Sequence, residues 1–591
     1  MVSQFHDCRW SLFLFVCLFS GLVTVALLCS VLVLLYYLST RKPRGFPPGP
    51  KWLPVLGSLL EVSKLRKETG YFSESCNILS AKYGSIIGLK IGFDKIVILN
   101  DFESMKAMIT NEDCDGRPVG PVYESRTFGK RRGLIVVDGH LWTQQRRFIL
   151  RQLRDFGFGR TDMALQIEFE AAQLVKYYEG LIRDNASEFY DRFNNNVDGK
   201  LAQKKAKCNG KIYCLAEGDL KKEDKEEKTE EEVPMKKSIT AEDFYMKIDD
   251  DAEIREAAKV PGIIVEMEDF FGVPVLNTLW TMMAGKRYNF NDEELIYLQR
   301  IFTRLLRDVD MFGCLFGHFP FLRYIAPEMS GYRKFVEIHA QVWKFLRNEL
   351  DNHKKTFKPE APRDLMDVYL NVLESGNPDY DHTFTESQLL AICVDLFIAG
   401  SETTSKALSF GFLYLVLNPK VQKKAQHELD LVVGRERLPS LNDRAKLPYM
   451  NAVVWESIRM FMGRTMNVPH RATKDTTIMG YKIPKDTMLV VNFNQILMGD
   501  FWGDPEAFRP ERFIDESGKL FLPEKFLPFS FGKHRCIGEV LAKSNVFVIT
   551  AALLQSFTFA PVPGEDPPRN EYVDGVTASP KPFRVLMTKR T

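Results

Sequence analysis

The sequence lacks an excess of either charge and lacks a regular cysteine pattern. Its 591 residues carry 79 Lys and Arg against 77 Asp and Glu, a formal net charge of +2. This balance gives no indication of a nucleic-acid partner, which would call for a basic surface. The 10 cysteines are irregularly spaced, which is not typical of a disulfide framework and favours a reducing compartment.

Long apolar runs are also scarce, and the main one lies at residues 11–38. At about 1.5 Å per residue it is long enough to cross a bilayer as a tilted helix. No small-residue cleavage site follows it, so a removable secretory signal is disfavoured. Four basic residues follow within residues 41–51, and the positive-inside rule then places the rest of the chain in the cytosol. We expect a single N-terminal transmembrane helix, with a buried core helix as the alternative.

Two further segments are predicted to be irregular. Residues 39–52 are basic and contain Phe46-Pro-Pro-Gly-Pro50, and prolines hold a chain extended, so we expect a stiff linker before a domain at residues 53–591. The composition changes at about residues 184–260, and residues 204–237 are dense in Lys and Glu. Such a segment cannot bury enough apolar surface to order itself. We predict an exposed, largely disordered insertion there.

A cysteine in a glycine-bounded loop is the main candidate for chemistry. Cys536 lies in the segment 529–538 (FSFGKHRCIG), directly after three cationic side chains and before an apolar helical run. Cations and a helix N-terminus favour thiolate over thiol, and glycines let a bulky partner approach the backbone. Such a thiolate is a nucleophile, a zinc ligand or a ligand of haem iron. Zinc would need further Cys or His at ligand spacing, and only His534 is near.

A second candidate lies inside a long apolar helix. Thr385-Glu-Ser-Gln388 is a capping box and Asn418-Pro419 ends the pattern, so we expect one central buried helix that runs to Leu417. Ala399-Gly-Ser-Glu-Thr-Thr404 stands in its middle. A glycine there costs about 1 kcal/mol relative to alanine, and a buried carboxylate is expensive unless it is satisfied. A glycine and a carboxylate are thus both unfavourable inside a buried helix, and their presence there indicates a functional site. A plain kink in the helix is the alternative.

Two helical pairs complete the set. Trp142 and Arg146 are four residues apart, hence on one helix face, where an indole N–H and a guanidinium can hold a carboxylate together. Glu456 and Arg459 carry opposite charges three residues apart. Taken alone, the first pair is explained as a solvated arginine beside a core tryptophan, and the second as a surface ion pair that contributes little energy.

Together these motifs resemble the cytochromes P450, from Phe46 to the C-terminus apart from the insertion. The resembling patterns are F-x-x-G-x-x-x-C-x-G at Phe529, Gly532, Cys536 and Gly538, A-G-x-[DE]-T-T at 399–404, E-x-x-R at Glu456 and Arg459, P-x-R-F with Arg512, and W-x-x-x-R at Trp142 and Arg146. The resemblance is to the animal microsomal, family-2-like clan, similar to its insect members. It implies a mostly α fold with small β-sheets, preceded by one transmembrane helix.

The resemblance also implies residue roles. Cys536 would be the axial thiolate ligand of haem b iron, in the loop marked by Phe529, Gly532 and Gly538. Arg117, Trp142, Arg146, His470 and His534 would hold the haem propionates. Gly400 would open space above the haem, Thr403 would handle oxygen and Glu402 would relay protons. Glu456, Arg459 and Arg512 would form a buried ion network that braces the haem loop.

The function implied is that of a haem-thiolate monooxygenase, which inserts one oxygen atom from O₂ into a small hydrophobic substrate. The substrate, a sesquiterpenoid, steroid, fatty acid or xenobiotic, would lie among residues 118–134, 396–399, 466–468 and 576–577. Electrons would come from NADPH through NADPH–cytochrome P450 reductase, with cytochrome b5 as a second donor, at the cytosolic face of the endoplasmic reticulum membrane. Two alternatives stay open: an isomerase or dehydratase of this fold that needs no reductase, and a non-enzymatic haem-binding protein.

Overall fold

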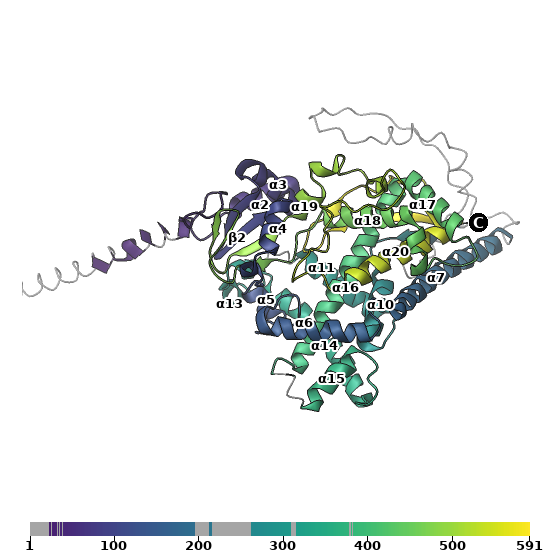
Figure 1. Ribbon diagram of the computed structural model, residues 1–591, viewed down its shortest axis with the longest axis horizontal. Helices are drawn as coiled ribbons and strands as arrows, with labels where there is room; N and C mark the ends of the chain where they lie inside the picture. The colour runs from purple at the N-terminus through teal and green to yellow at the C-terminus, as the bar shows by residue number, and fades with distance from the viewer. Residues whose placement is uncertain are drawn as a thin grey trace, which may run out of the picture.

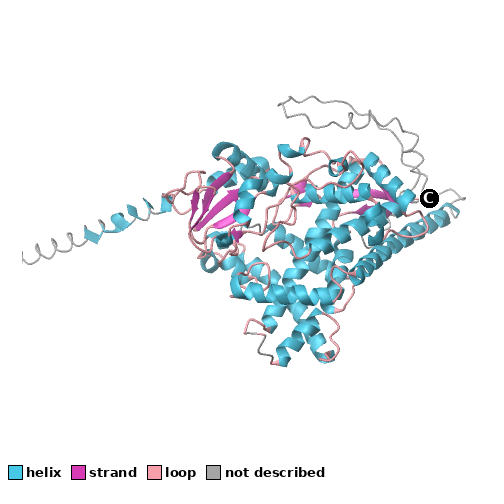
Figure 2. Ribbon diagram, viewed as in Figure 1, coloured by secondary structure: helices cyan, strands magenta, loops and turns pink. Residues whose placement is uncertain are grey.

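The molecule is mostly helical, with small β-sheets toward its ends (Figures 1 and 2). This computed structural model describes residues 23–590 except 25–26, 32, 35, 38, 195–211, 215–261, 309–314, 377–379 and 381. The prediction of a mostly α fold with small sheets is confirmed.

The helices of the N-terminal half are numbered up to α14. They are α2 (Leu59–Thr69), α3 (Phe72–Tyr83), α4 (Phe102–Ile109), α5 (Pro121–Ser125), α6 (Gly139–Asp155), α7 (Thr161–Asn194), α10 (Gly272–Ala284), α11 (Glu293–Asp308), α12 (Leu315–His318), α13 (Leu322–Ile325) and α14 (Tyr332–Thr356). Those of the C-terminal half are α15 (Leu365–Ser375), α16 (Glu386–Leu417), α17 (Pro419–Val432), α18 (Pro448–Met462), α19 (Phe493–Leu497) and α20 (Glu539–Ser556).

The predicted long central helix is α16, and its predicted bounds are confirmed. Thr385 caps it by accepting the backbone N–H of Gln388 at 3.1 Å. The Gln388 side chain does not complete the capping box, because its Nε2 donates to the carbonyl of Gly133 at 3.0 Å. The helix is buried along most of its length, since α10, α14, α18 and α20 all pack on it. Its middle therefore lies in the core.

Two four-stranded sheets are found among the described residues. The first has the order β1-β2-β8-β5, with β1 (Ile86–Ile91), β2 (Asp94–Leu99), β5 (His470–Arg471) and β8 (Met488–Val491). The second has the order β3-β4-β12-β9, with β3 (Ile212–Cys214), β4 (Gly262–Glu266), β9 (Phe557–Ala560) and β12 (Arg584–Lys589). Two-stranded pairs are formed by β6 (Thr476–Ile478) with β7 (Tyr481–Ile483), and by β10 (Tyr572–Val573) with β11 (Ser579–Pro580).

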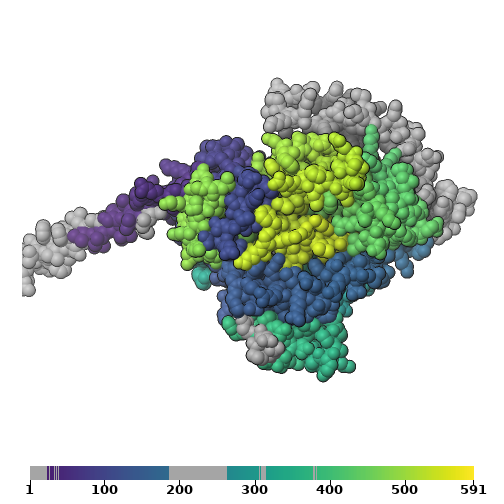
Figure 3. Space-filling model, viewed as in Figure 1, coloured from purple at the N-terminus to yellow at the C-terminus, as the bar shows by residue number. Residues whose placement is uncertain are grey.

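The first sheet joins distant parts of the chain. β2 pairs in parallel with β8, from Ile96 opposite Met488 to Leu99 opposite Val491. Figure 3 accordingly shows the purple-blue N-terminal part beside light-green residues from the C-terminal third. This pairing brings His470, on β5, next to the segment that carries Arg117, through the bridge between Gly116 and Arg471.

The predicted transmembrane segment at 11–38 lies largely outside the described residues. Its described residues, within 23–37, are helical and project from the end that carries the first sheet (Figure 1). Within the described part of the chain, we find no helix long and apolar enough to span a membrane. The anchor stays a prediction.

The predicted insertion at 184–260 also lies mostly outside the described residues. At its start α7 continues as helix to Asn194, and within it β3 pairs antiparallel with β4, Tyr213 opposite Ile264. The segment thus begins as the end of a helix and supplies an edge strand. The rest of the charged run lies outside the described residues, and its disorder stays a prediction.

Candidate functional site

The predicted cysteine lies in a tight loop before α20. The Cys536 N–H donates to the carbonyl of Phe529 at 3.1 Å and closes the loop. Gly532 has φ +71°, and a Cβ there would lie 2.9 Å from Cγ2 of Ile109 on α4. Both the left-handed backbone and the close approach of α4 require glycine at this position.

The Cys536 side chain is exposed, yet burial of its surroundings raises the pKa of its thiol. The Gly538 N–H and the guanidinium groups of Arg146 and Arg535 lower the pKa, but less than burial raises it. The neighbouring cations act as predicted but do not by themselves favour the thiolate. A coordinated metal ion would, because coordination deprotonates a thiol.

The predicted pair on α6 faces this loop. The Arg146 guanidinium lies 5.2 Å from the centre of the Trp142 ring, and its Nη2 donates to the carbonyl of Arg535 at 2.7 Å. Trp142 also packs against His534, with ring centres 4.4 Å apart. The two side chains share one face of α6, and both contact the cysteine loop.

Arg117 reaches the same region from the segment after α4. Its Nη1 donates to the carbonyls of Val468 and Pro469 at 3.0 and 2.9 Å. Its Nε is buried and has no partner among the described residues. A buried N–H without a partner is costly, and this one indicates an anionic group that Arg117 is built to hold.

Two histidines lie beside Arg117. His470 Nδ1 is 3.0 Å from the carbonyl of Cys114, His534 Nε2 is 2.9 Å from the carbonyl of Asp115, and the rings are 5.2 Å apart. Burial, together with the charge of Arg117, lowers the pKa of His534 to about 3 and lowers that of His470 well below its ordinary value. Both rings are therefore neutral near pH 7.

The motif in the middle of α16 is more constrained than the sequence suggested. A Cβ at Gly400 would lie 2.3 Å from Cδ2 of Leu279 on α10, so a larger residue here would displace that leucine methyl group. Thr403 Oγ1 donates to the carbonyl of Ala399 at 2.7 Å. Glu402 Oε2 accepts a hydrogen bond from Thr303 of α11 at 2.9 Å.

The predicted ion network is a buried cluster. Arg459 donates through Nε and Nη2 to both oxygens of Glu456, at 2.7 and 2.8 Å, and Arg512 Nε donates to Glu456 at 3.0 Å. The side chains of Glu456 and Arg459 are fully buried. Backbone carbonyls accept from the other guanidinium nitrogens: Arg459 Nη1 donates to Leu497 at 2.8 Å, and Arg512 Nη1 donates to Trp502 at 2.7 Å. The cluster holds the segment 497–512 against α18.

Asp395 was missed at the sequence level. Its carboxylate, in the apolar part of α16, is almost completely buried. It accepts the backbone N–H groups of Leu134 and Ile135 at 2.6 and 2.8 Å and forms an ion pair with Arg126. The signal that could have found it is the one that found Glu402, a charge inside an apolar helix.

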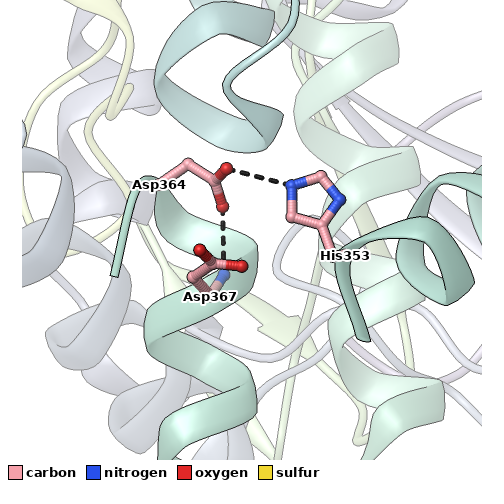
Figure 4. A group of neighbouring side chains, drawn as sticks. All are labelled: His353, Asp364 and Asp367. Carbon is pink, nitrogen blue, oxygen red and sulfur yellow. Dashed lines mark hydrogen bonds and ion pairs between the residues drawn. The ribbon is translucent and has the colours of Figure 1, made fainter. Parts of the chain in front are cut away.

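A further buried cluster joins α14 and α15 (Figure 4). His353 Nε2 is 2.9 Å from Asp364, whose other oxygen accepts the Asp367 N–H at 3.0 Å. Asp367 forms an ion pair with Arg363 at 2.6 Å, and His353 Nδ1 is 2.9 Å from the carbonyl of Glu349. The candidate ligand atoms thus have protein partners, so we interpret the cluster as structural.

The groups around Cys536 fit an iron porphyrin. The accessible thiol offers a soft ligand for iron. Arg117, with its unpartnered buried Nε, and Arg146 lie on the flanks, where the two propionates of a haem need cationic donors. The neutral histidines add hydrogen-bonding groups without extra charge. A helical body around α16, with a cysteine loop at the start of α20, is the arrangement of a haem-thiolate oxidoreductase.

Comparison with known proteins agrees with this class. A match to the Cytochrome P450 family covers residues 47–197 and 238–587. The chain therefore belongs to the cytochrome P450 family, and it is an oxidoreductase with a haem iron cofactor and monooxygenase chemistry.

The relatives are animal proteins that span nearly the whole chain. One is "Probable cytochrome P450 303a1" of Drosophila melanogaster, 40% identical over 95% of this chain and 98% of its own length. Another is the farnesoate epoxidase of Bombyx mori, 31% identical over 96% and 99%. A third is cytochrome P450 2J1 of Oryctolagus cuniculus, 30% identical over 94% and 93%. The predicted similarity to the family-2-like clan and its insect members is confirmed.

Proposed function

We propose that this monooxygenase binds haem iron through Cys536 and inserts one oxygen atom into a small apolar substrate. The observation that carries the proposal is the accessible thiol of the closed loop before α20, flanked by Arg117 and Arg146. When bound, the haem supplies the activation of dioxygen. The chain binds and orients the reactants, keeps water out and moves protons.

In this proposal two residues of α16, Thr403 and Glu402, hold and transfer the protons that the reaction consumes. The Thr403 hydroxyl donates to Ala399, and its oxygen keeps lone pairs that can accept a hydrogen bond. Glu402 is a partly buried carboxylate beside it, able to exchange a proton as a general acid or base does. Thr403→Ala should raise hydrogen peroxide released per NADPH consumed and lower organic product. An unchanged product yield per NADPH would make Thr403 structural.

For the substrate we favour an apolar molecule of sesquiterpenoid size. The support is the similarity to a relative named farnesoate epoxidase and the apolar character of residues 396–399 in the predicted pocket. Titration of the holoenzyme with a sesquiterpenoid, a steroid and a fatty acid, read as shifts of the Soret band, ranks the three classes. A shift with the steroid or fatty acid alone would remove the sesquiterpenoid from the proposal.

We also propose NADPH–cytochrome P450 reductase as the electron donor, docked near Cys536. Arg147, Arg151 and Arg154 form an exposed basic row on α6, and complementary charge speeds association and is screened by salt. Arg147→Gln with Arg151→Gln should slow electron transfer several-fold at low salt, whereas Lys420→Gln on α17 should not. Turnover without NADPH and reductase would instead support the isomerase alternative.

Attachment to the endoplasmic reticulum membrane is a further part of the proposal. Exposed apolar side chains gather next to the start of the domain: Phe93, Phe321, Tyr324, Ile325 and Met329. Phe93 binds the chain before α13, because its N–H donates to the His318 carbonyl at 3.2 Å. Lys90, on the same hairpin, donates to Ser39 at 2.8 Å, at the end of the N-terminal helix. Deletion of residues 1–38 should weaken sedimentation with vesicles, and the further change Ile325→Asp should abolish it.

The central test is Cys536→Ser. We expect this variant to lose the red-shifted ferrous–CO absorption of the family, while Cys76→Ala, a cysteine buried in α3, should keep it. A Cys536→Ser protein that keeps the band would show that another group binds the iron.

A further inference from the structure

Glu402 is held by two side chains that the sequence motif does not include. Its Oε2 accepts the hydrogen bond from Thr303 of α11 at 2.9 Å, and its Oε1 lies 3.7 Å from Nζ of Lys406. The Lys406 side chain is only 6% exposed and that of Glu402 only 12%. Each oxygen of the Glu402 carboxylate therefore has its own partner: Thr303 on α11 for one, and Lys406 on α16 itself for the other.

Lys406 is unusual because it is a charged side chain on a core-facing helix. A buried ammonium is costly unless an opposite charge compensates it. Lys406 lies four residues after Glu402, one turn along the same face of α16, and Glu402 is the carboxylate with which it pairs. The 3.7 Å distance is that of an ion pair rather than of a direct hydrogen bond. Lys406 therefore orients the carboxylate by charge and leaves its oxygen able to accept or release a proton.

Thr303 differs from Lys406 in that it belongs to another helix. The same part of α11 binds the turn at 576–577, because the Val576 N–H donates to the Leu306 carbonyl at 2.9 Å. That turn is one of the segments predicted to line the substrate pocket. The hydrogen bond on Oε2 thus depends on where α11 stands, whereas the charge of Lys406 moves with Glu402.

We propose that Lys406 and Thr303 are positioning residues for Glu402, and that they make its availability for proton transfer depend on the placement of α11 over the pocket. The proposal rests on the proposed role of Glu402 in oxygen chemistry. Lys406 keeps the carboxylate aligned along α16. Thr303 holds Oε2 while α11 is in the observed position, and release of that bond frees the oxygen.

The first test is a double-mutant cycle in the full-length holoenzyme with reductase. Lys406→Met keeps the side-chain length and removes the charge. We expect about tenfold slower oxygen consumption, less than the roughly 10²–10⁴-fold that an acid–base group itself contributes, because Lys406 only positions Glu402. The acidic limb of its pH profile should move to higher pH, because an unpaired buried carboxylate holds its proton more tightly. Lys406→Arg should restore both.

The cycle separates positioning from stability. In a Glu402→Gln background, Lys406→Met should cause no further loss, because the group that it positions is already gone. A purely structural lysine would add its full effect in both backgrounds, and that result would overturn the proposal. Ser405→Ala, which removes a neighbouring hydroxyl of α16 bonded to Ser401, is the control for general disturbance of the helix.

The second test needs no turnover. In the resting holoenzyme, Thr303→Val should increase amide hydrogen exchange in α11, and Thr303→Ser should restore protection. Unchanged exchange would show that the bond to Glu402 does not hold α11, and it would overturn the coupling. This measurement decides the question even if Lys406→Met fails to bind haem. If Glu402→Gln alone leaves oxygen consumption unchanged, the proposed role of Glu402 fails, while the exchange result still reports on the contact.

Discussion

The Asp395 carboxylate accepts the backbone N–H of Leu134 at 2.6 Å, although 261 residues separate the two in the chain. A Cβ at Gly133 would lie 2.2 Å from Asp395 Oδ2, and Gly133 also has φ +94°. The loop before α6 is therefore fitted closely around this one carboxylate. Its shape depends on a charge buried in α16.

We expect Asp395→Asn to weaken substrate binding by about tenfold, near the value of one hydrogen bond to a charged group. The amide has one acceptor oxygen and no charge for the two N–H groups and Arg126, so the loop loses its fixed shape. Haem content should stay near that of the parent. The measurement is the Kd from Soret titration, with Glu386→Gln on the first turn of α16 as control. Equal Kd values would show that the loop does not shape the pocket.

Glu456→Gln should destabilise the protein by about 3–5 kcal/mol, because Arg459 and Arg512 would keep their charges in a buried site without the carboxylate. Thermal unfolding of the holoprotein measures this. Glu328→Gln, which breaks an exposed pair with Arg333, should change stability by less than about 1 kcal/mol. Similar effects for the two variants would contradict a bracing role.

Arg146→Ala should lower the haem content per polypeptide, because the site around Cys536 then loses a cationic donor and the contact with the Arg535 carbonyl. Arg147→Ala, the next residue on the exposed side of α6, is the matched control and should bind haem normally. We expect Arg117→Ala to be the more severe change, because Arg117 is the more buried arginine. Full haem content in both site variants would reject their assignment to the propionates.

The His353 cluster predicts a pH dependence of stability. Burial lowers the pKa of His353, but the hydrogen bond and the charge of Asp364 outweigh it, and the net pKa is raised above 6.5. A group with a raised folded pKa stabilises fully below its unfolded pKa, and this contribution is lost as the pH rises through the folded pKa.

His353→Gln should therefore lower stability below about pH 6.5, by about 1–3 kcal/mol. The difference from the parent should shrink at alkaline pH. Thermal unfolding of both proteins across the pH range measures it. The other charges in the cluster are Asp367 and Arg363, which neutralise each other. A difference that stays constant with pH would show that His353 is neutral in the folded protein.

Local signals in the sequence predicted much of this structure. Thr385 and Asn418-Pro419 fixed the ends of α16 because capping and proline chemistry act within a few residues. The cysteine loop was predicted as a motif, but the reason for Gly400 was not, since Leu279 approaches it from a distant helix. Thr303 escaped notice for the same reason, because its partner Glu402 lies on another helix. Asp395 and Lys406 carried a signal that was not used, because each is a charge inside an apolar helix.

The attachment of the loop before α6 to α16 has a consequence for how a substrate enters. Gln388 binds both the N–H and the carbonyl of Gly133, and Asp395 binds the next two N–H groups. The loop before α6 is therefore held firmly against α16. By contrast, α11 is joined to α16 by the hydroxyl of Thr303, to the 576–577 turn by one backbone bond, and to the segment before α10 by the ion pair of Arg300 with Asp269. If a substrate enters between α11 and this loop, we expect α11 to move and the loop before α6 to keep its place, because the loop has more bonds to α16 than α11 has.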